Sequence, residues 1–167
     1  KANAPVDAKD NDFFTALMYA AQWSGIPQKR GVDHEKVVAA LIEAGADVKV
    51  ADKLKRTAAM LAASAGSSEI ITLLVEANAD IDATDTSGFS ALWLASVCGH
   101  AKVVETLVEA GANSPQSARQ CAFGEGHDDV VRILDKASDL LAEKDAQVRE
   151  LQEELVVLTG ARSTLKT

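Results

Sequence analysis

Aromatic side chains are scarce in this chain of 167 residues. Phe, Trp and Tyr together make up 4% of it, although 47% of its residues are apolar. Alanine accounts for much of the difference, with 30 residues. Strands of β-sandwiches are enriched in aromatic and β-branched residues, so this composition favours closely packed helices over a β-fold.

Cysteine, basic residues and long apolar runs are also limited. Cys98 and Cys121 are too few for a disulfide scaffold and have no zinc-ligand spacing, so we expect a reducing, intracellular and cytoplasmic environment. The formal net charge of −8, from 17 Lys and Arg against 25 Asp and Glu, argues against nucleic acid or an anionic membrane as the main partner. No apolar run approaches the roughly 20 residues that span a bilayer.

A sequence repeat organises the middle of the chain. Two copies open at Asp52 and Asp85, which are 33 residues apart. Each copy continues through an Ala-rich stretch, a Gly, paired Val/Ile and Leu residues and a short Ala-Gly-Ala or Ala-Asn-Ala turn. The spacing predicts an inner helix followed by an amphipathic outer helix. The expected inner-helix caps are Thr15, Thr57, Ser90 and Ser117, and the expected left-handed helix ends are Gly45, Asn78 and Gly111.

The pattern D-x-x-G-x-T-x-L-x-x-A-A-x-x-G-H-x-x-V-V-x-x-L-V-x-x-G-A resembles the ankyrin repeat. The resemblance implies an all-α solenoid of helix-turn-helix units joined by hairpin loops. It predicts repeats at 10–51, 52–84, 85–116 and 117–134; the first carries a surface loop around residues 24–32 and the fourth lacks most of its hairpin. Residues 1–9 align with the end of another repeat, which indicates a fragment, the ordered part of a longer chain, or a degenerate cap.

Residues with chemical potential fit structural roles in this pattern. His34, His100 and His127 recur once per repeat, which indicates structural histidines rather than a metal site. No P-loop and no nucleophile turn is present. We therefore expect no catalysis, no metal and no cofactor. The expected function is a protein–protein interaction module; the alternatives are a fixed subunit of a large assembly, or the ankyrin segment of a larger enzyme or channel.

The resemblance implies that partners bind the hairpin tips and the concave inner-helix face. Large side chains beside the Thr/Ser and Gly positions, at the tips and on the inner helices, are candidates because aromatic residues and Arg are common binding anchors. Their positions follow from alignment of the repeats, and Phe13 and Phe14 are adjacent, so one of the two is expected to face inward. The predicted partner-binding residues are Phe14, Trp23, Lys53, Leu54, Arg56, Phe89 and Trp93.

A long helix is predicted after the repeats. Residues 128–159 contain no Gly or Pro, and apolar residues follow a seven-residue spacing from Leu134. We expect a coiled-coil-like helix over 135–160, ended by Gly160, and a frayed tail over 161–167. The helix could pair with a second copy, pair with a partner helix, or fold back as a cap; its acidic flanks favour a basic partner. The predicted contact residues are Leu141, Val148, Leu151, Leu155 and Leu158.

Overall fold

The computed structural model describes residues 5–25, 33–113 and 116–164, without the side chains of 157–164. Residues 26–32 of the predicted loop, and Pro115, lie outside the described residues. The chain divides into two units, Lys1–Leu134 and Asp135–Thr167. The described elements are all helical, apart from an isolated bridge between Ala51 and Thr57, so the predicted all-α fold is confirmed.

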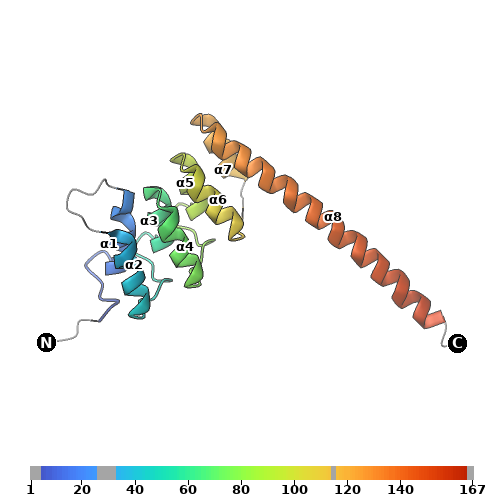
Figure 1. Ribbon diagram of the computed structural model, residues 1–167, viewed down its shortest axis with the longest axis horizontal. Helices are drawn as coiled ribbons and strands as arrows, with labels where there is room; N and C mark the ends of the chain where they lie inside the picture. The colour runs from blue at the N-terminus through green and yellow to red at the C-terminus, as the bar shows by residue number, and fades with distance from the viewer. Residues whose placement is uncertain (1–4, 26–32, 114–115, 165–167) are drawn as a thin grey trace. The chain divides into compact units, whose positions relative to one another are not determined.

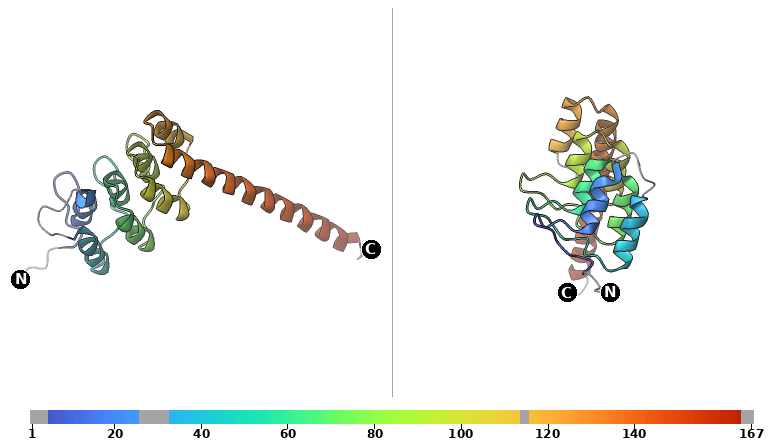
Figure 2. Two further views of the ribbon diagram at one scale, coloured as in Figure 1. Left: turned by 45° about the horizontal axis from the view of Figure 1, so that its top comes forward. Right: turned by 90° about the vertical axis from the view of Figure 1, so that its left-hand side faces the viewer.

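The first unit is a stack of helix pairs. Its inner helices are α1 (Ala16–Gln22, continued by the 3-10 turn η1, Trp23–Gly25), α3 (Ala58–Ala65), α5 (Ala91–Val97) and α7 (Gln116–Gly124). Its outer helices are α2 (His34–Glu43), α4 (Ser68–Glu76), α6 (Ala101–Glu109) and the first turns of α8 (Asp128–Thr164). Each inner helix packs against the next one, and α4 packs between α2 and α6. Figures 1 and 2 show the pairs following one another in chain order.

Alanine makes the close contacts between inner helices. Ala62, Ala63, Ala95 and Ala118 are at 0% exposure, and leucine, isoleucine and valine from the outer helices complete the core. A methyl side chain allows two helix axes to approach closely and loses no rotamer entropy on burial. The high alanine content therefore follows from the architecture of the stack.

The helix ends follow local hydrogen-bonding rules. The hydroxyl groups of Thr15, Thr57 and Ser90 accept the N–H three residues later, which confirms three of the predicted caps. Ser117 lies inside α7, which begins at Gln116, so the prediction of a cap there is wrong. The predicted left-handed residues have positive φ angles, namely 85° at Gly45, 61° at Asn78 and 87° at Gly111.

An aspartate organises each of the first three hairpin tips. Asp52 Oδ1 accepts the N–H groups of Leu54 and Arg56, and Asp10 and Asp85 make the same pair of bonds in their own tips. The residue three positions after each aspartate is left-handed. It is Gly88 in the third repeat, with φ of 83°, but Phe13 in the first, with φ of 67°, and Lys55 in the second, with φ of 60°.

Neighbouring repeats are joined by backbone and histidine hydrogen bonds. The Lys53 N–H donates to the Asp12 carbonyl, and the Thr86 N–H donates to the Leu54 carbonyl. His100 Nε2 lies 3.1 Å from the Ser64 carbonyl oxygen and His127 Nε2 lies 3.0 Å from that of Val97. A carbonyl only accepts, so both rings donate across a repeat boundary.

His34 does not share the position of the other two histidines. Asp33 is the residue that caps the outer helix there, and its carboxylate accepts the Lys36 N–H. His34 is the first residue of α2, one position later. The expectation that all three histidines occupy one slot is therefore wrong for His34.

The second unit consists of the later part of α8. The helix continues through Gly160 to Thr164, so Gly160 is not a helix end and the predicted fraying does not begin at 161. Val130 and Leu134, on the first turns of α8, are buried in the core of the first unit. Among the described residues, no helix has the length and apolar character needed to cross a membrane.

The left-handed tip residues yield a stability prediction. A residue with a Cβ costs about 1–2 kcal/mol in the left-handed region, and part of that is offset by the greater unfolded-state freedom of glycine. We expect Lys55→Gly to raise the free energy of unfolding by about 0.5–1 kcal/mol in urea denaturation. Gly88→Ala is the reverse control and should lower it, since no atom lies within 4 Å of its added Cβ and only the backbone changes. Equal effects of one sign would contradict this account.

Candidate functional site

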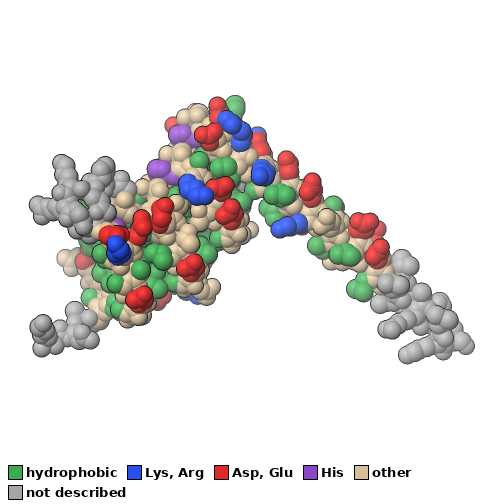
Figure 3. Space-filling view, in the orientation of Figure 1, with side chains coloured by type: hydrophobic (Ala, Val, Ile, Leu, Met, Phe, Trp, Pro, Cys, Tyr) green, Lys and Arg blue, Asp and Glu red, His purple; other side chains and the backbone are tan. Residues whose placement is uncertain are grey.

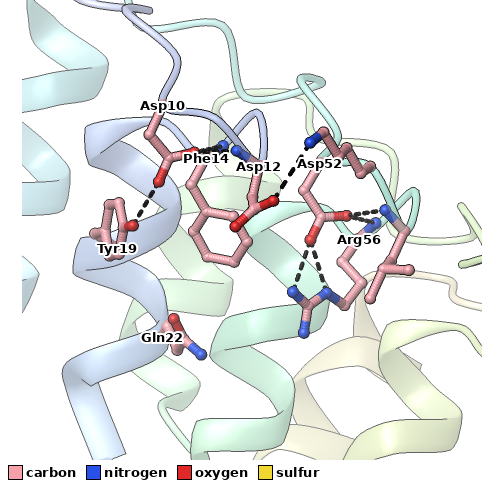
Figure 4. A pocket seen from close by; sticks show the side chains of 9 residues that line it. Asp10, Asp12, Phe14, Tyr19, Gln22, Asp52 and Arg56 are labelled. Carbon is pink, nitrogen blue, oxygen red and sulfur yellow. Dashed lines mark hydrogen bonds and ion pairs between the residues drawn. The ribbon is translucent and has the colours of Figure 1, made fainter.

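A hollow of about 500 Å³ opens between the tips of the first two repeats. It is bounded by residues from two tips and from the exposed side of α1, which stacking of the repeats brings together (Figure 4). Of the predicted site residues, Phe14, Lys53, Leu54 and Arg56 line it. The other lining residues are Asp10, Asp12, Tyr19, Gln22 and Asp52.

Phe14 belongs to the floor of the hollow rather than to its exposed rim. Its side chain is only 8% exposed. The Tyr19 ring lies with its centroid 5.1 Å away, and the Arg56 guanidinium lies 5.3 Å from the ring centroid. The prediction that Phe14 is an exposed partner contact is therefore wrong, because two neighbours, one of them from the next repeat, cover its ring.

Arg56 is held in place by Asp52. Its Nε and Nη2 each lie 2.8 Å from Asp52 Oδ2, while the other oxygen of that carboxylate accepts the two backbone N–H groups of the tip. The Asp52 side chain is 2% exposed and that of Arg56 is 33% exposed. The guanidinium is thus preorganised at the surface, because a buried carboxylate fixes its orientation.

A second carboxylate pairs with a tyrosine on α1. The Tyr19 hydroxyl donates to Asp10 Oδ2 at 2.6 Å, as Figure 4 shows. This bond lowers the pKa of Asp10, with help from the Phe14 N–H, and raises the pKa of Tyr19. On the open side, Asp12 and Lys53 form an exposed ion pair at 3.4 Å, which contributes little to stability.

The rim of the hollow carries exposed apolar side chains. Trp23, directly after Gln22, is 53% exposed and Leu54 is 51% exposed, where the sequence predicts contacts. Phe13 and Tyr19 are 49% and 45% exposed, and sequence reasoning missed both as site residues. The available signal was that Phe13 stands at the glycine position of the repeat pattern, where a bulky residue is unexpected.

Phe89 and Trp93 lie in the third repeat and do not line the hollow. Their rings stack on each other, with centroids 3.6 Å apart and an interplanar angle of 9°. Both side chains are half-buried, whereas Met18 and Met60, at the positions equivalent to Trp93, are 1% exposed. Only residues 113–115 separate the end of the third repeat from α7, so no full tip follows to cover Trp93.

The predicted contact residues of α8 are exposed as far as the described side chains extend. Leu158 lies outside them. The exposed fractions are 53% for Leu141, 50% for Val148, 64% for Leu151 and 62% for Leu155.

The site is built for recognition by its geometry. The carboxylates of Asp10 and Asp52 are committed to hydrogen bonds that shape the tips. Within the described residues, no group of three or more His, Cys, Asp and Glu side chains is placed to hold a metal ion. An open hollow with an apolar rim and a fixed guanidinium suits the side chains of a macromolecular partner.

Comparison with known proteins agrees with this architecture. A family model described as ankyrin repeats, in three copies, matches residues 28–118, which is more than half of the chain. No curated protein matches the chain.

The Asp10–Tyr19 bond yields a pH prediction. The pKa of Asp10 is lowered from 3.8, so its contribution to stability is present above that unfolded-state value and is lost as pH falls through the lower folded-state pKa. We expect Tyr19→Phe to reduce the urea midpoint at pH 7, and the difference from the parent to shrink as pH falls below 3.8. Asp10→Asn should remove most of the effect of Tyr19→Phe. A difference that does not change with pH would contradict the assignment.

The burial of Phe14 yields a second prediction for this site. Phe14→Ala should lower the free energy of unfolding by about 3 kcal/mol, because it removes a buried ring beneath Tyr19 and Arg56. Phe13→Gly is the matched control on the adjacent exposed ring and should cause no loss. Chemical denaturation of both variants checks this, and a loss below about 1 kcal/mol for Phe14→Ala would contradict a core role.

Proposed function

This chain belongs to the ankyrin-repeat family, whose members are generally protein–protein interaction modules, and we propose that it binds a protein partner without catalysis. The partner contacts the hollow between the first two tips, with Phe13, Tyr19, Trp23 and Leu54 as the apolar anchors around it. The later part of α8 is a second binding element. The observation that carries the proposal is Phe13, which is exposed although its backbone is strained.

The strain at Phe13 needs a benefit to offset it. A bulky residue at φ of 67° is disfavoured, and the equivalent position in the third repeat is Gly88. The ring does not stabilise a core, since 49% of the side chain is exposed. Strained residues persist most often at sites where their side chain is used. Partner contact accounts for an aromatic ring at this position.

The charges near Phe13 indicate what the partner carries. The ammonium groups of Lys9 and Lys53 lie 5.8 and 5.6 Å from the centroid of the Phe13 ring. The preorganised guanidinium of Arg56 lines the same hollow. This is a local basic surface on a chain of net charge −8. A segment with an apolar anchor next to acidic side chains complements it, because opposite potentials favour docking and register.

A peptide-display selection tests this function with ligands drawn from a random library. Peptides selected on the parent chain should be rich in apolar residues flanked by Asp and Glu. We expect Phe13→Gly and Leu54→Ala each to weaken their binding about tenfold, measured by calorimetry. Val37→Ala is the matched control, since Val37 is an exposed apolar residue on the outer helix α2. Its affinity should equal that of the parent.

Two-dimensional NMR locates the same peptides on the chain. Amide signals of residues 10–23 and 52–56 should shift on binding. Shifts confined to α2, α4 and α6, or equal weakening by Val37→Ala, would contradict a site between the tips. Urea denaturation of each variant shows whether a change of affinity reflects contact or unfolding.

A further inference from the structure

We propose that residues 141–158 of α8 pair with the same segment of a second copy of the chain, as a parallel two-stranded coiled coil. This deepens the proposed function, and rests on it, by naming the partner of the second binding element. The occupant follows from three features of the helix: an exposed apolar seam, the residues that flank the seam, and a single lysine within it.

The seam has coiled-coil spacing. Leu141, Val148 and Leu155 are seven residues apart, and Leu151 and Leu158 follow the latter two by three, as expected for the a and d positions of a heptad. Every described side chain from 138 to 156 is exposed. Figure 3 shows apolar and acidic side chains interspersed on this part of the helix. Most helical stability in proteins comes from packing of an apolar face, and an exposed seam offers such a face.

The flanking residues permit a parallel self-pair. At the e and g positions, Gln147 faces Gln152 of the partner subunit, so two amides meet and no acidic pair is created. Glu143, Glu150 and Glu153 take the c and f positions, away from the seam. The acidic residues that favour a basic partner in the sequence therefore do not oppose a second copy once each is placed in the heptad.

Lys144 sets the orientation. It occupies a d position, where a parallel partner surrounds it with the residues at the neighbouring a, d and e positions. The e residue is Asp145 of the partner subunit, which supplies the opposite charge. An antiparallel pair centred on the same seam places Lys144 opposite Leu155 of the partner subunit instead. A lysine at an interface is costly unless it is paired, so the parallel arrangement is favoured.

Sedimentation equilibrium of the full chain tests the association. The mass should rise with concentration from 17.6 kDa to twice that value. Val148→Asp should weaken the dimer at least about tenfold, because it places two carboxylates at one seam position. Val156→Asp is the matched control, because Val156 is another exposed valine of α8 and lies outside the seam. It should leave the dissociation constant unchanged.

A charge swap and a cross-link test the orientation. Lys144→Glu should weaken the dimer, and adding Asp145→Lys should restore most of the loss, because the pair between chains is rebuilt with exchanged signs. In a background of Cys98→Ala and Cys121→Ala, Leu151→Cys should oxidise to a covalent dimer. Val156→Cys in the same background should not.

Several outcomes would overturn the proposal. They are a 17.6 kDa mass at every concentration, equal weakening by Val148→Asp and Val156→Asp, and cross-linking only in a mixture of Val148→Cys and Leu151→Cys chains, which is the antiparallel result. Association only with an added basic helical peptide would also overturn it. Peptide binding at the tips is measured separately: Phe13→Gly should leave the dimer intact, and Val148→Asp should leave the affinity of each tip site intact.

Discussion

A helix pair in the stack has apolar surface on two sides, and only the next pair removes that surface from water. The inner-helix contacts are made by alanine side chains at 0% exposure, such as Ala62 and Ala95, so neighbouring backbones lie close together. Close approach leaves little tolerance for displacement, because a shift of one helix would open a gap beside many small side chains. Each repeat therefore depends on its neighbours for both stability and position.

Directional bonds across each boundary fix what alanine packing alone would leave loose. His100 and His127 donate to carbonyl groups of the preceding repeat, and backbone N–H groups connect one tip to the next. The tips are consequently rigid although they contain little regular structure. That rigidity allows Arg56, fixed by the buried Asp52, to lie over Phe14 of the preceding repeat. The surface offered to a partner is thus preorganised, which reduces the entropy cost of binding.

The sequence predicted features that depend on local chemistry. The caps at Thr15 and Thr57 and the left-handed ends at Gly45 and Asn78 require only a hydroxyl, or a residue that tolerates positive φ, at a fixed place in a repeat. The repeat period itself predicted the order and pairing of the helices. These features are determined within a few residues of chain, so the pattern contains them.

The direction of the two adjacent phenylalanines was not determined in that way. Phe13 turns outward because its backbone is left-handed, and Phe14 is covered by Arg56, which follows it by 42 residues. Both facts depend on how one tip packs on the next, which no local pattern records. The same is true of Trp93, whose partial exposure follows from a tip that the next repeat lacks. Contacts between repeats therefore limited the prediction of the site more than that of the fold.

The two binding elements differ in chemistry and so serve different kinds of contact. The hollow offers a few exposed anchors beside fixed charges, an arrangement that recognises one segment at a time. The seam of α8 offers regularly spaced apolar residues, an arrangement that recognises a helix of matching period. Pairing of that seam between two copies gives a particle with two hollows. A partner with two suitable segments then binds with an affinity raised by effective concentration, without any additional contact at either hollow.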